Sequence, residues 1–581
     1  MRTTTWIRIL LLLLLFVFGI YLFLRPFAGP PPTPIAKGST LVVELGGEYV
    51  EAQSASPLAR IAGDRTRPFI ELLSVFSLAE RDDRIATVVL RIQPLEIGWG
   101  KADELRAAIE RLREKGRKTI ALLEVQSFSA NKELYVGSAA DELWVAPGAG
   151  IPLVGMAAEY VFLGGFWEQL GVDFDVARAG KYKSAVETFS ERTMSDASRE
   201  MASSLLDDSY RRFIAALARS RGKTPEAIRA TIDAGYVHTS ELVEAGLIDG
   251  ETHLDELVAK LGPDVVRHAD YLHADPRQVG FDPKARFALI YGSGPVVQGD
   301  AEAAPLAPGQ SFASDTVARA IHDAADDPEI AAIVLRIDSP GGSAMASELI
   351  WRALARAREH GKPIVASFSD VAASGGYYVA SAADVIVSDP GTLTGSIGVF
   401  ALRPVVGGLL DKLEIGVDAL TRGAHADFLL STDKMSPAAR ERLQGSVIDT
   451  YRLFLERVGH GRAMSVEQVD AIGQGRVWTG EQAAAAGLVD ELGGLYTAVR
   501  RAKQEAGLDV DADVALVTFP REKPLAQQLI ELMQGVAVGA MARAGGPAVE
   551  WPEPIARILA ATRGLPLGAP LLIPPVLVEI R

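Results

Sequence analysis

The chain repeats itself, and this internal duplication constrains the fold more than any other feature of the sequence. The run ATVVLRI from Ala86 is matched by AAIVLRI from Ala331, at an offset of 245 residues. The run SAADELWVAPG from Ser138 is matched by SAADVIVSDPG from Ser381, at an offset of 243. One register maintained over so long a stretch indicates an internal repeat rather than chance similarity. We therefore expect two copies of one structural unit.

Each copy alternates short apolar runs with segments of helical periodicity. AAIVLRID is typical of a buried strand, because it is short, rich in β-branched residues and followed by a Pro-Gly turn. The segment Ser347–Gly361 has the apolar spacing of a helix, with Ser347 as a possible N-cap and Gly361 as the stop. This alternation predicts an α/β fold with parallel sheets and crossover helices in each copy.

The segments outside the two copies differ from them in composition. The expected segments are a cytoplasmic N-terminus over 1–8, a transmembrane anchor over 9–25, a Pro-rich linker over 26–37, an N-terminal repeat over 38–275, a C-terminal repeat over 285–505 and a C-terminal extension over 506–581. The extension offers one strand, VALVTF, an amphipathic stretch over 525–533 and a Pro-rich end. We interpret it as packing or assembly structure.

The N-terminal segment has the character of a membrane anchor. Ile9–Leu24 carries no charge and is bounded by Arg8 and Arg25. As a helix it spans about 24 Å, and the residues before it extend it towards the roughly 30 Å hydrocarbon core. The alternative is a cleaved signal peptide, but no A-x-A site follows. Arg2 and Arg8 favour a cytoplasmic start, which would place the body across the membrane.

The composition excludes several function classes. A net charge of -15 without a basic patch argues against a nucleic-acid partner. The chain has no cysteine, which rules out thiol catalysis, thiolate metal sites and disulfides. The eight histidines show no metal-ligand spacing, so neither a metal nor another cofactor is expected.

The two copies have lost different chemical groups. Ser374, in AASGGYY of the second copy, aligns with Asn131 of the first. The turn SPGGS at Ser339–Ser343 aligns with Pro94–Gly98, PLEIG, which lacks the paired glycines. The first copy therefore lacks both the serine and the glycine turn.

The loss is reversed further along the chain. Lys183, in GKYKSAVETF of the first copy, aligns with the window Ala424–Ala426 of the second copy, which holds no lysine. Each copy thus retains what the other has lost.

Serine, lysine and a glycine turn are parts of one catalytic site. A serine hydroxyl becomes nucleophilic when a neighbouring base takes its proton, and a buried lysine is such a base once its pKa falls. A glycine turn presents backbone N–H groups to a developing oxyanion. Taken singly, the three features are also compatible with a tightly packed helix start, a plain turn and a solvated lysine. Their complementary distribution favours a site shared by the two copies.

The motifs LRIDSPGGS, AASGGYYVASAAD, GTLTGSIGV and YKSAVE resemble the signal peptide peptidase A (protease IV) family in its long, internally duplicated bacterial form. The resemblance covers nearly the whole chain. It implies two tandem repeats related to the Clp protease/crotonase fold, an inner-membrane anchor, a periplasmic catalytic body and a homo-oligomer, a tetramer in the family.

The resemblance also implies residue roles. Ser374 would be the nucleophile and Lys183 the general base of a Ser–Lys dyad. Gly341, Gly342 and Gly375 would form the oxyanion hole. Lys181 departs from the family pattern by giving GKYK, and we interpret it as a solvated neighbour.

The sequence hypothesis is therefore a membrane-anchored serine endopeptidase that degrades cleaved signal peptides and other apolar peptides. Two alternatives stay open: a crotonase-like acyl-CoA enzyme and a catalytically inactive membrane scaffold. His425, inside the window that faces Lys183, is the competing base. We further expect that serine and lysine meet within a single chain, across the boundary between its two copies.

Overall fold

The computed structural model describes most of the chain, namely residues 35–51, 67–127, 129–301, 311–521 and 571–572. No helix among these residues is long and apolar enough to cross a membrane. The expected anchor over 9–25 and the amphipathic stretch over 525–533 lie outside them, as does most of the Pro-rich linker. These three expectations, like the expected segment boundaries, remain predictions.

The first copy is built on a parallel sheet with the strand order β2-β1-β3-β4-β5-β7, in which β8 also pairs with β1. The strands are β1 (Ser39–Val50), β2 (Arg67–Pro68), β3 (Ile85–Glu96), β4 (Lys118–Leu123), β5 (Glu142–Val145), β7 (Gly250–Glu251) and β8 (Val265–Arg267). The helices are α3 (Phe69–Arg81), α4 (Trp99–Glu114), α5 (Asn131–Gly137), α8 (Asp196–Ser220), α9 (Pro225–Ala234), α10 (Thr239–Glu244), α11 (Leu254–Leu261) and α12 (His268–Tyr271).

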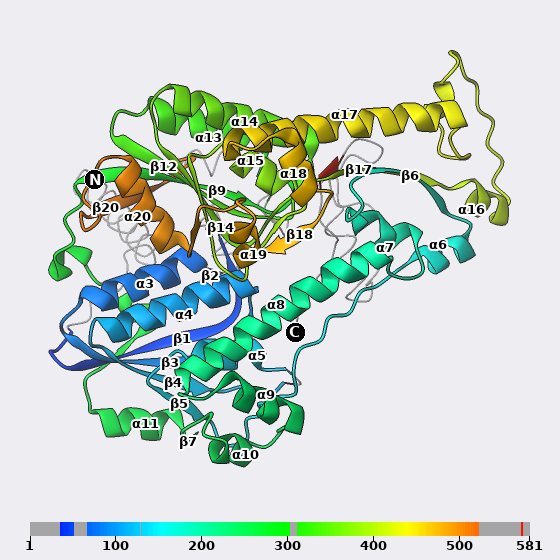
Figure 1. Cartoon of the computed structure of the whole chain (residues 1–581). Helices are drawn as coiled ribbons and strands as arrows, with labels where there is room; N and C mark the ends of the chain where they lie inside the picture. Colours follow the sequence, from blue (N-terminus) through cyan, green and yellow to red (C-terminus); the bar gives the residue numbers. More distant parts are fainter. Residues whose placement is uncertain (1–34, 52–66, 128, 302–310, 522–570, 573–581) are drawn as a thin grey trace, which may run out of the picture.

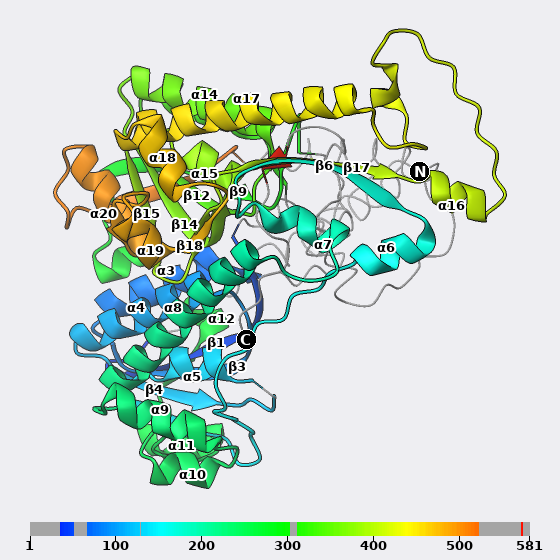
Figure 2. The same cartoon turned by 45° about the vertical axis from the view of Figure 1, so that its right-hand side comes forward.

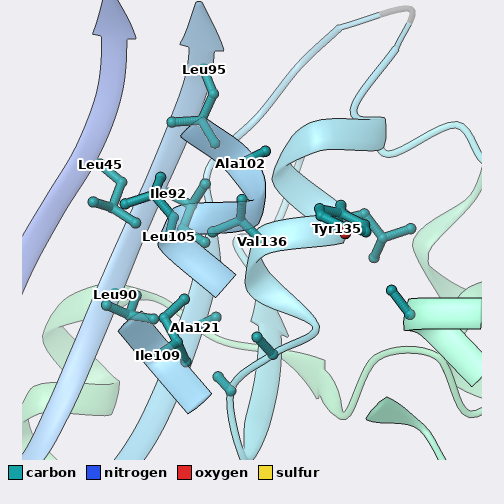
Figure 3. Packing of buried hydrophobic residues seen from close by; sticks show 14 of the residues in the cluster. Leu45, Leu90, Ile92, Leu95, Ala102, Leu105, Ile109, Ala121, Tyr135 and Val136 are labelled. Carbon is teal, nitrogen blue, oxygen red and sulfur yellow. The ribbon is translucent and has the colours of Figure 1, made fainter. Parts of the chain in front are cut away.

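Apolar side chains from the sheet and its helices form the core of this copy. Leu90 and Ile92 of β3 lie against Leu105 and Ile109 of α4 and against Val136 of α5 (Figure 3). All five side chains are fully buried. The near-continuous apolar run of β3 is what a strand covered on both faces requires, because helices flank a parallel sheet.

The second copy repeats this plan for the strands that the copies share, because β9-β12-β14-β15-β19 follows the order of β1-β3-β4-β5-β7. Its sheet runs β18-β16-β14-β12-β9-β20, with β15 joining β14 to β19, and all pairs are parallel except β16 with β18. The strands are β9 (Ala285–Ser293), β12 (Ile330–Ser339), β14 (Ile364–Ala373), β15 (Val385–Ser388), β16 (Leu393–Gly395), β18 (Val477–Thr479), β19 (Glu491–Leu492) and β20 (Val514–Phe519). The helices are α13 (Ser314–Asp326), α14 (Ala344–Glu359), α15 (Gly375–Ala380), α17 (Pro437–Arg462), α18 (Val466–Ile472), α19 (Gly480–Ala485) and α20 (Leu495–Glu505).

The α/β fold with parallel sheets is thus confirmed, as is the strand expected for VALVTF, which is β20. One helix start was predicted wrongly. Helix α14 begins at Ala344 with Ser343 as its N-cap, whose side chain accepts from the Ala346 N–H. Ser347 lies inside the helix and donates its hydroxyl to the Ser343 carbonyl at 2.9 Å, because serine four residues into a helix can bond back to the preceding turn.

A third sheet joins the two copies, and no pattern in the sequence predicts it. Its order is β11-β10-β13-β21-β17-β6. The strands are β6 (Asp173–Ala179), β10 (Val296–Val297), β11 (Phe312–Ala313), β13 (Gly342–Ser343), β17 (Val399–Val405) and β21 (Leu571–Leu572). β6 of the first copy pairs antiparallel with β17 of the second along its whole length. The chain therefore crosses from one copy onto the other immediately before Lys183.

The β6–β17 ribbon extends away from the two parallel sheets. Helices α6 (Gly164–Leu170) and α16 (Gly407–Lys412) lie at its far end in both views (Figures 1 and 2). Within the ribbon, buried Asp175 accepts from Arg403 across the two strands and from Arg440 of α17 at 3.0 Å. This ionic contact fixes the segment that leads from the first copy to the second.

Candidate active site

Ser374 lies at the junction of strand β14 and helix α15. Its backbone has φ 55° and ψ -112°, and its N–H donates to the Gly395 carbonyl at 2.7 Å. A positive φ is unfavourable for a residue with a side chain, by about 1–3 kcal/mol. Such strain persists where the surrounding structure holds one side chain in a required direction, and it is concentrated at functional sites.

Lys183 reaches the second copy because it follows β6 directly. Its segment docks on the loop before β18, where the Tyr182 N–H donates to the Gln474 carbonyl at 2.8 Å. Gly475 makes this approach possible: a Cβ there would lie 2.5 Å from the Lys183 nitrogen, and its φ of 79° also favours glycine. The short helix η1 (Ser184–Val186) begins after Lys183.

The two side chains meet inside the protein. Lys183 Nζ lies 2.7 Å from Ser374 Oγ, 2.9 Å from the Ser396 carbonyl oxygen and 3.0 Å from Ser396 Oγ. Lys183 and Ser374 are both fully buried, with 0% of their surface exposed. One chain thus brings together a lysine of its first copy and a serine of its second.

The electrostatics of this pocket favour a neutral amine. Burial lowers the pKa of Lys183 well below its ordinary value, and in the part of the chain that the structure describes no carboxylate bonds to Nζ to oppose this shift. A neutral amine has two N–H donors and one lone pair. If the N–H groups bond to the two Ser396 oxygens, the lone pair faces the Ser374 hydroxyl and can take its proton.

The predicted oxyanion turn lies next to Ser374. A Cβ on Gly375 would lie 3.0 Å from the Gly342 nitrogen and 2.7 Å from Ser347 Oγ, so these elements pack closely. Gly341 has a φ of 94°, which requires glycine. Its N–H donates to Ser339 Oγ at 3.1 Å. Gly341 therefore shapes the turn, and its N–H is already engaged by the Ser339 side chain.

The equivalent position in the first copy is filled by internal contacts. Asn131 is buried and donates its amide to the Gly155 carbonyl at 2.9 Å. Glu133 accepts from the Leu95 N–H at 2.7 Å, in the turn that aligns with SPGGS. Asn131, at the position of the serine, and Leu95, in the turn at the position of the glycines, thus both form hydrogen bonds inside the first copy.

The two rival basic residues lie elsewhere. Lys181 is exposed, with Nζ 4.5 Å from the centre of the Tyr182 ring, which agrees with its interpretation as a solvated neighbour. His425 is also exposed, just before the short helix η3 (Ala426–Leu429). Neither is a hydrogen-bond partner of Ser374 Oγ, which contacts Lys183.

Sequence reasoning missed two residues of the site. Ser396 supplies two of the three oxygens around Lys183 Nζ, and it has a φ of 51°. It lies within the motif GTLTGSIGV, but a serine between a glycine and an isoleucine gives no separate signal. Gly475 lies in GQGR, about 290 residues from the lysine it accommodates, and only the fold reveals that contact.

Comparison with known proteins gives the class and then the family. The pattern of peptidase family S49 matches residues 111–265 and 356–509, once in each copy. The chain is 34% identical over 502 residues to the chloroplastic serine protease SPPA of Arabidopsis thaliana, covering 84% of this chain and 72% of that one. It is 30% identical over 545 residues to Protease 4 of Salmonella typhi, covering 87% and 85%.

Among solved structures, the 1510-N membrane-bound stomatin-specific protease has a TM-score of 0.26 and 15% identity, covering 40% of this chain and 98% of that chain. The match to the family pattern and the similarity to the two proteases of Arabidopsis thaliana and Salmonella typhi show that this duplicated α/β chain is a serine peptidase. More particularly, the chain belongs to peptidase family S49, because the family pattern covers more than half of it. The expected family resemblance is thereby confirmed.

Proposed function

We propose that this protein is a membrane-anchored serine endopeptidase that uses Ser374 as nucleophile and Lys183 as general base. The observation that carries the proposal is the 2.7 Å contact between Lys183 Nζ and Ser374 Oγ in a buried pocket. Family membership supports peptide-bond hydrolysis, and the lowered pKa of Lys183 supports its role as base.

The proposed reaction has two halves. Neutral Lys183 takes the Ser374 hydroxyl proton as Oγ attacks the peptide carbonyl carbon, and the N–H groups of Gly342 and Gly375 stabilise the oxyanion. The ammonium of Lys183 then gives its proton to the leaving amine, and an ester remains on Ser374. In the second half Lys183 takes a proton from water as the water oxygen attacks the ester carbonyl carbon. Its ammonium then returns that proton to Ser374 Oγ as the ester bond breaks, and the carboxylic acid product leaves and ionises in water.

The third sheet supports an extended peptide as substrate. Leu571–Leu572 pairs antiparallel with Gly342–Ser343 on one side and with Phe400 of β17 on the other. A backbone in that position lies beside the proposed oxyanion donors. Strand addition of this kind binds through main-chain hydrogen bonds and therefore tolerates varied side chains.

The finer assignment includes substrate, location and assembly. We propose that the substrates are cleaved signal peptides and other apolar peptides, and that residues 9–25 anchor the protein in the bacterial inner membrane with its body in the periplasm. A tether raises the effective concentration of the enzyme beside peptides released in the bilayer. We also propose a homo-oligomer, a tetramer as in the resembling family, with repeats of the Clp protease/crotonase type.

A fluorophosphonate probe applied to the full-length protein in membranes tests the nucleophile. We expect labelling of the wild type and none of Ser374→Ala, with peptide hydrolysis lost in parallel. Labelling of the wild type should rise with pH through the lowered pKa of Lys183, because the neutral amine is the base. His425→Ala should retain near-normal turnover. An unlabelled, folded wild type would refute the proposal and favour an acyl-CoA enzyme or an inactive scaffold.

Location and assembly need separate experiments. Protease added to spheroplasts should degrade the body if it is periplasmic, whereas protection until the membrane is lysed would contradict that location. The mass of the detergent-solubilised protein should be a multiple of the chain mass, and a monomer would contradict the proposed oligomer.

A further inference from the structure

A buried lysine of the first copy forms ion pairs with two aspartates in the strands that lead to the proposed catalytic elements of the second copy. Lys101, in the first turn of α4, has 2% of its surface exposed. Its Nζ lies 2.6 Å from Asp338 Oδ2, 2.9 Å from Asp370 Oδ2 and 3.2 Å from Glu51 Oε1. Two of these carboxylates belong to the second copy.

The two carboxylates of the second copy lie next to the reactive groups. Asp338 immediately precedes the turn that begins at Ser339, at the end of β12. Asp370 lies in β14, four residues before Ser374. Asp338 Oδ1 also accepts from the Val371 N–H at 3.1 Å, so one carboxylate spans both strands. The strand register shifts at this point, between Ile337 and Ser339, and the carboxylate takes up an N–H where the ladder is irregular.

The first turn of α4 is docked on β14 through its backbone as well. The N–H groups of Gly98 and Lys101 both donate to Asp370, at 2.9 and 2.8 Å. A Cβ on Gly98 would lie 2.4 Å from the Asp370 carboxyl, and one on Gly100 would lie 2.4 Å from the Ser369 carbonyl oxygen. Only glycine permits so close an approach at these two positions, so helix and strand are held at a fixed separation.

This docking point corresponds to the lost oxyanion turn of the first copy. Gly98 aligns with Ser343, and α4 aligns with α14, the helix that follows the glycine turn in the second copy. The turn that no longer faces a nucleophile of its own copy now contacts the strand that carries Ser374.

The charges around the cluster make Lys101 hard to replace. Burial alone would lower the pKa of Lys101, but Asp338, Asp370 and Glu51 together hold it well above its ordinary value, so it is a cation. The nearby Arg336 bonds to Glu51 at 2.9 Å and to Glu104 at 2.7 Å. In the part of the chain that the structure describes, Lys101 is thus the cation that forms ion pairs with both aspartates.

We propose that Lys101 is a positioning residue for catalysis: through Asp338 and Asp370 it fixes the oxyanion turn and the nucleophile relative to each other. The inference rests on the proposed function of Ser374. Without the cation, two neighbouring carboxylates repel each other at the ends of β12 and β14, and the two strand ends separate. A displacement of about 1 Å in a catalytic group can lower the rate by about a hundredfold.

The test compares Lys101→Met with Lys362→Met in the full-length protein. Lys362 is a matched control because it contacts the start of β12, whereas Lys101 contacts Asp338 near its end. Lys362 Nζ donates to the Asp327 carbonyl at 3.0 Å and to the Ile330 carbonyl. We expect Lys101→Met to lower kcat and the fluorophosphonate labelling rate about tenfold or more, with KM within about twofold. Lys362→Met should retain both. Measurements are made well below the melting temperature of each variant.

A second variant separates positioning from loss of stability. Lys101→Met with Asp338→Asn removes the repulsion and keeps an oxygen for the Val371 N–H, so it should regain most of the lost kcat. No recovery of kcat in a folded double variant would overturn the proposal. So would a kcat of Lys101→Met equal to that of Lys362→Met.

If Lys101→Met does not fold, Asp370→Asn tests the same positioning role, because it removes the ion pair between Lys101 and the strand that carries Ser374. The variant should fold, because Asp338 and Glu51 still pair with the lysine. We expect its kcat to fall at least about threefold below that of Lys362→Met, and an unchanged kcat would overturn the proposal. An unlabelled wild type would instead refute the function of Ser374, so the two failures are distinguishable.

Discussion

Replacing Lys183 with methionine should make the protein more stable relative to wild type as the pH falls. Methionine is close to lysine in length and carries no titrating group. In the fold, burial lowers the pKa of Lys183, whereas in the unfolded chain its pKa is about 10.4. Between these two pKa values the wild-type lysine must release a proton to fold, and the variant need not.

The magnitude follows from linkage. The unfolded wild type binds one proton more than the folded state in this window, so its free energy of unfolding rises with pH by about 1.4 kcal/mol per unit. The free energy of unfolding of Lys183→Met lacks this slope. The variant also loses the hydrogen bonds from Lys183 to Ser374 and Ser396. This loss changes the difference in free energy of unfolding between variant and wild type by a constant amount and leaves its pH dependence unchanged. The advantage of the variant should therefore shrink steadily as the pH rises.

Calorimetry at pH 8 and 9.5 measures this difference. At about 2.1 cal/mol/K per residue, 1.4 kcal/mol corresponds to roughly 1–2 °C in a protein of this size. The gap in melting temperature between Lys183→Met and wild type should close by about that amount per pH unit. Ser374→Ala is the control, because it removes the same Lys183–Ser374 contact but no proton, so its gap should stay constant. A constant gap for Lys183→Met would mean that Lys183 is protonated in the fold, and it could not then be the base.

Three further predictions concern the geometry of the site. Ser396→Ala removes one of the two oxygens that orient Nζ of Lys183, so kcat should fall by roughly fivefold, from about 1 kcal/mol, with a small change in KM; an unchanged kcat would contradict that role. Gly375→Ala places a methyl group 3.0 Å from the Gly342 nitrogen and should lower kcat about a hundredfold while the fold survives; full activity would place the oxyanion donors elsewhere. Co-expressed Lys183→Ala and Ser374→Ala chains should form inactive mixed oligomers, because the two residues meet within one chain; substantial recovery of hydrolysis would show a site shared between chains.

The sequence was sufficient to predict the repeated fold and to select Ser374 and Lys183, which lie 2.7 Å apart in the structure. Strands such as β12 are continuous apolar runs, and turns and helix ends carry local signals, so alternation of strand and helix is visible without a structure. Ser374 and Lys183 could be predicted because the duplication supplied an internal comparison. Asn131 and the window Ala424–Ala426 showed which positions each copy had given up.

What the sequence could not reveal depends on contacts between distant segments. The pairing of β6 with β17 leaves no periodic pattern, since each strand alone is an ordinary short run. Lys101 lies in the first turn of an ordinary helix in GWGKADEL, and nothing local indicates that three carboxylates converge on it. Ser396 is one serine among many until the fold brings it to Lys183. Such residues are defined by tertiary structure alone.

The first copy therefore contributes residues to the site, although it has lost the serine and the glycine turn. It delivers Lys183 to the site through β6, and the turn at Gly98 that once matched the glycine turn now holds Asp370. Reversing one loss would not recreate a second site. A serine at position 131 would still lack a glycine turn, because the turn at Pro94–Gly98 has no paired glycines and its Leu95 N–H donates to Glu133. It would also lack a lysine, because the window Ala424–Ala426 holds none and lies in the segment before α17. Once each copy had become part of the other's surroundings, the two losses were fixed together.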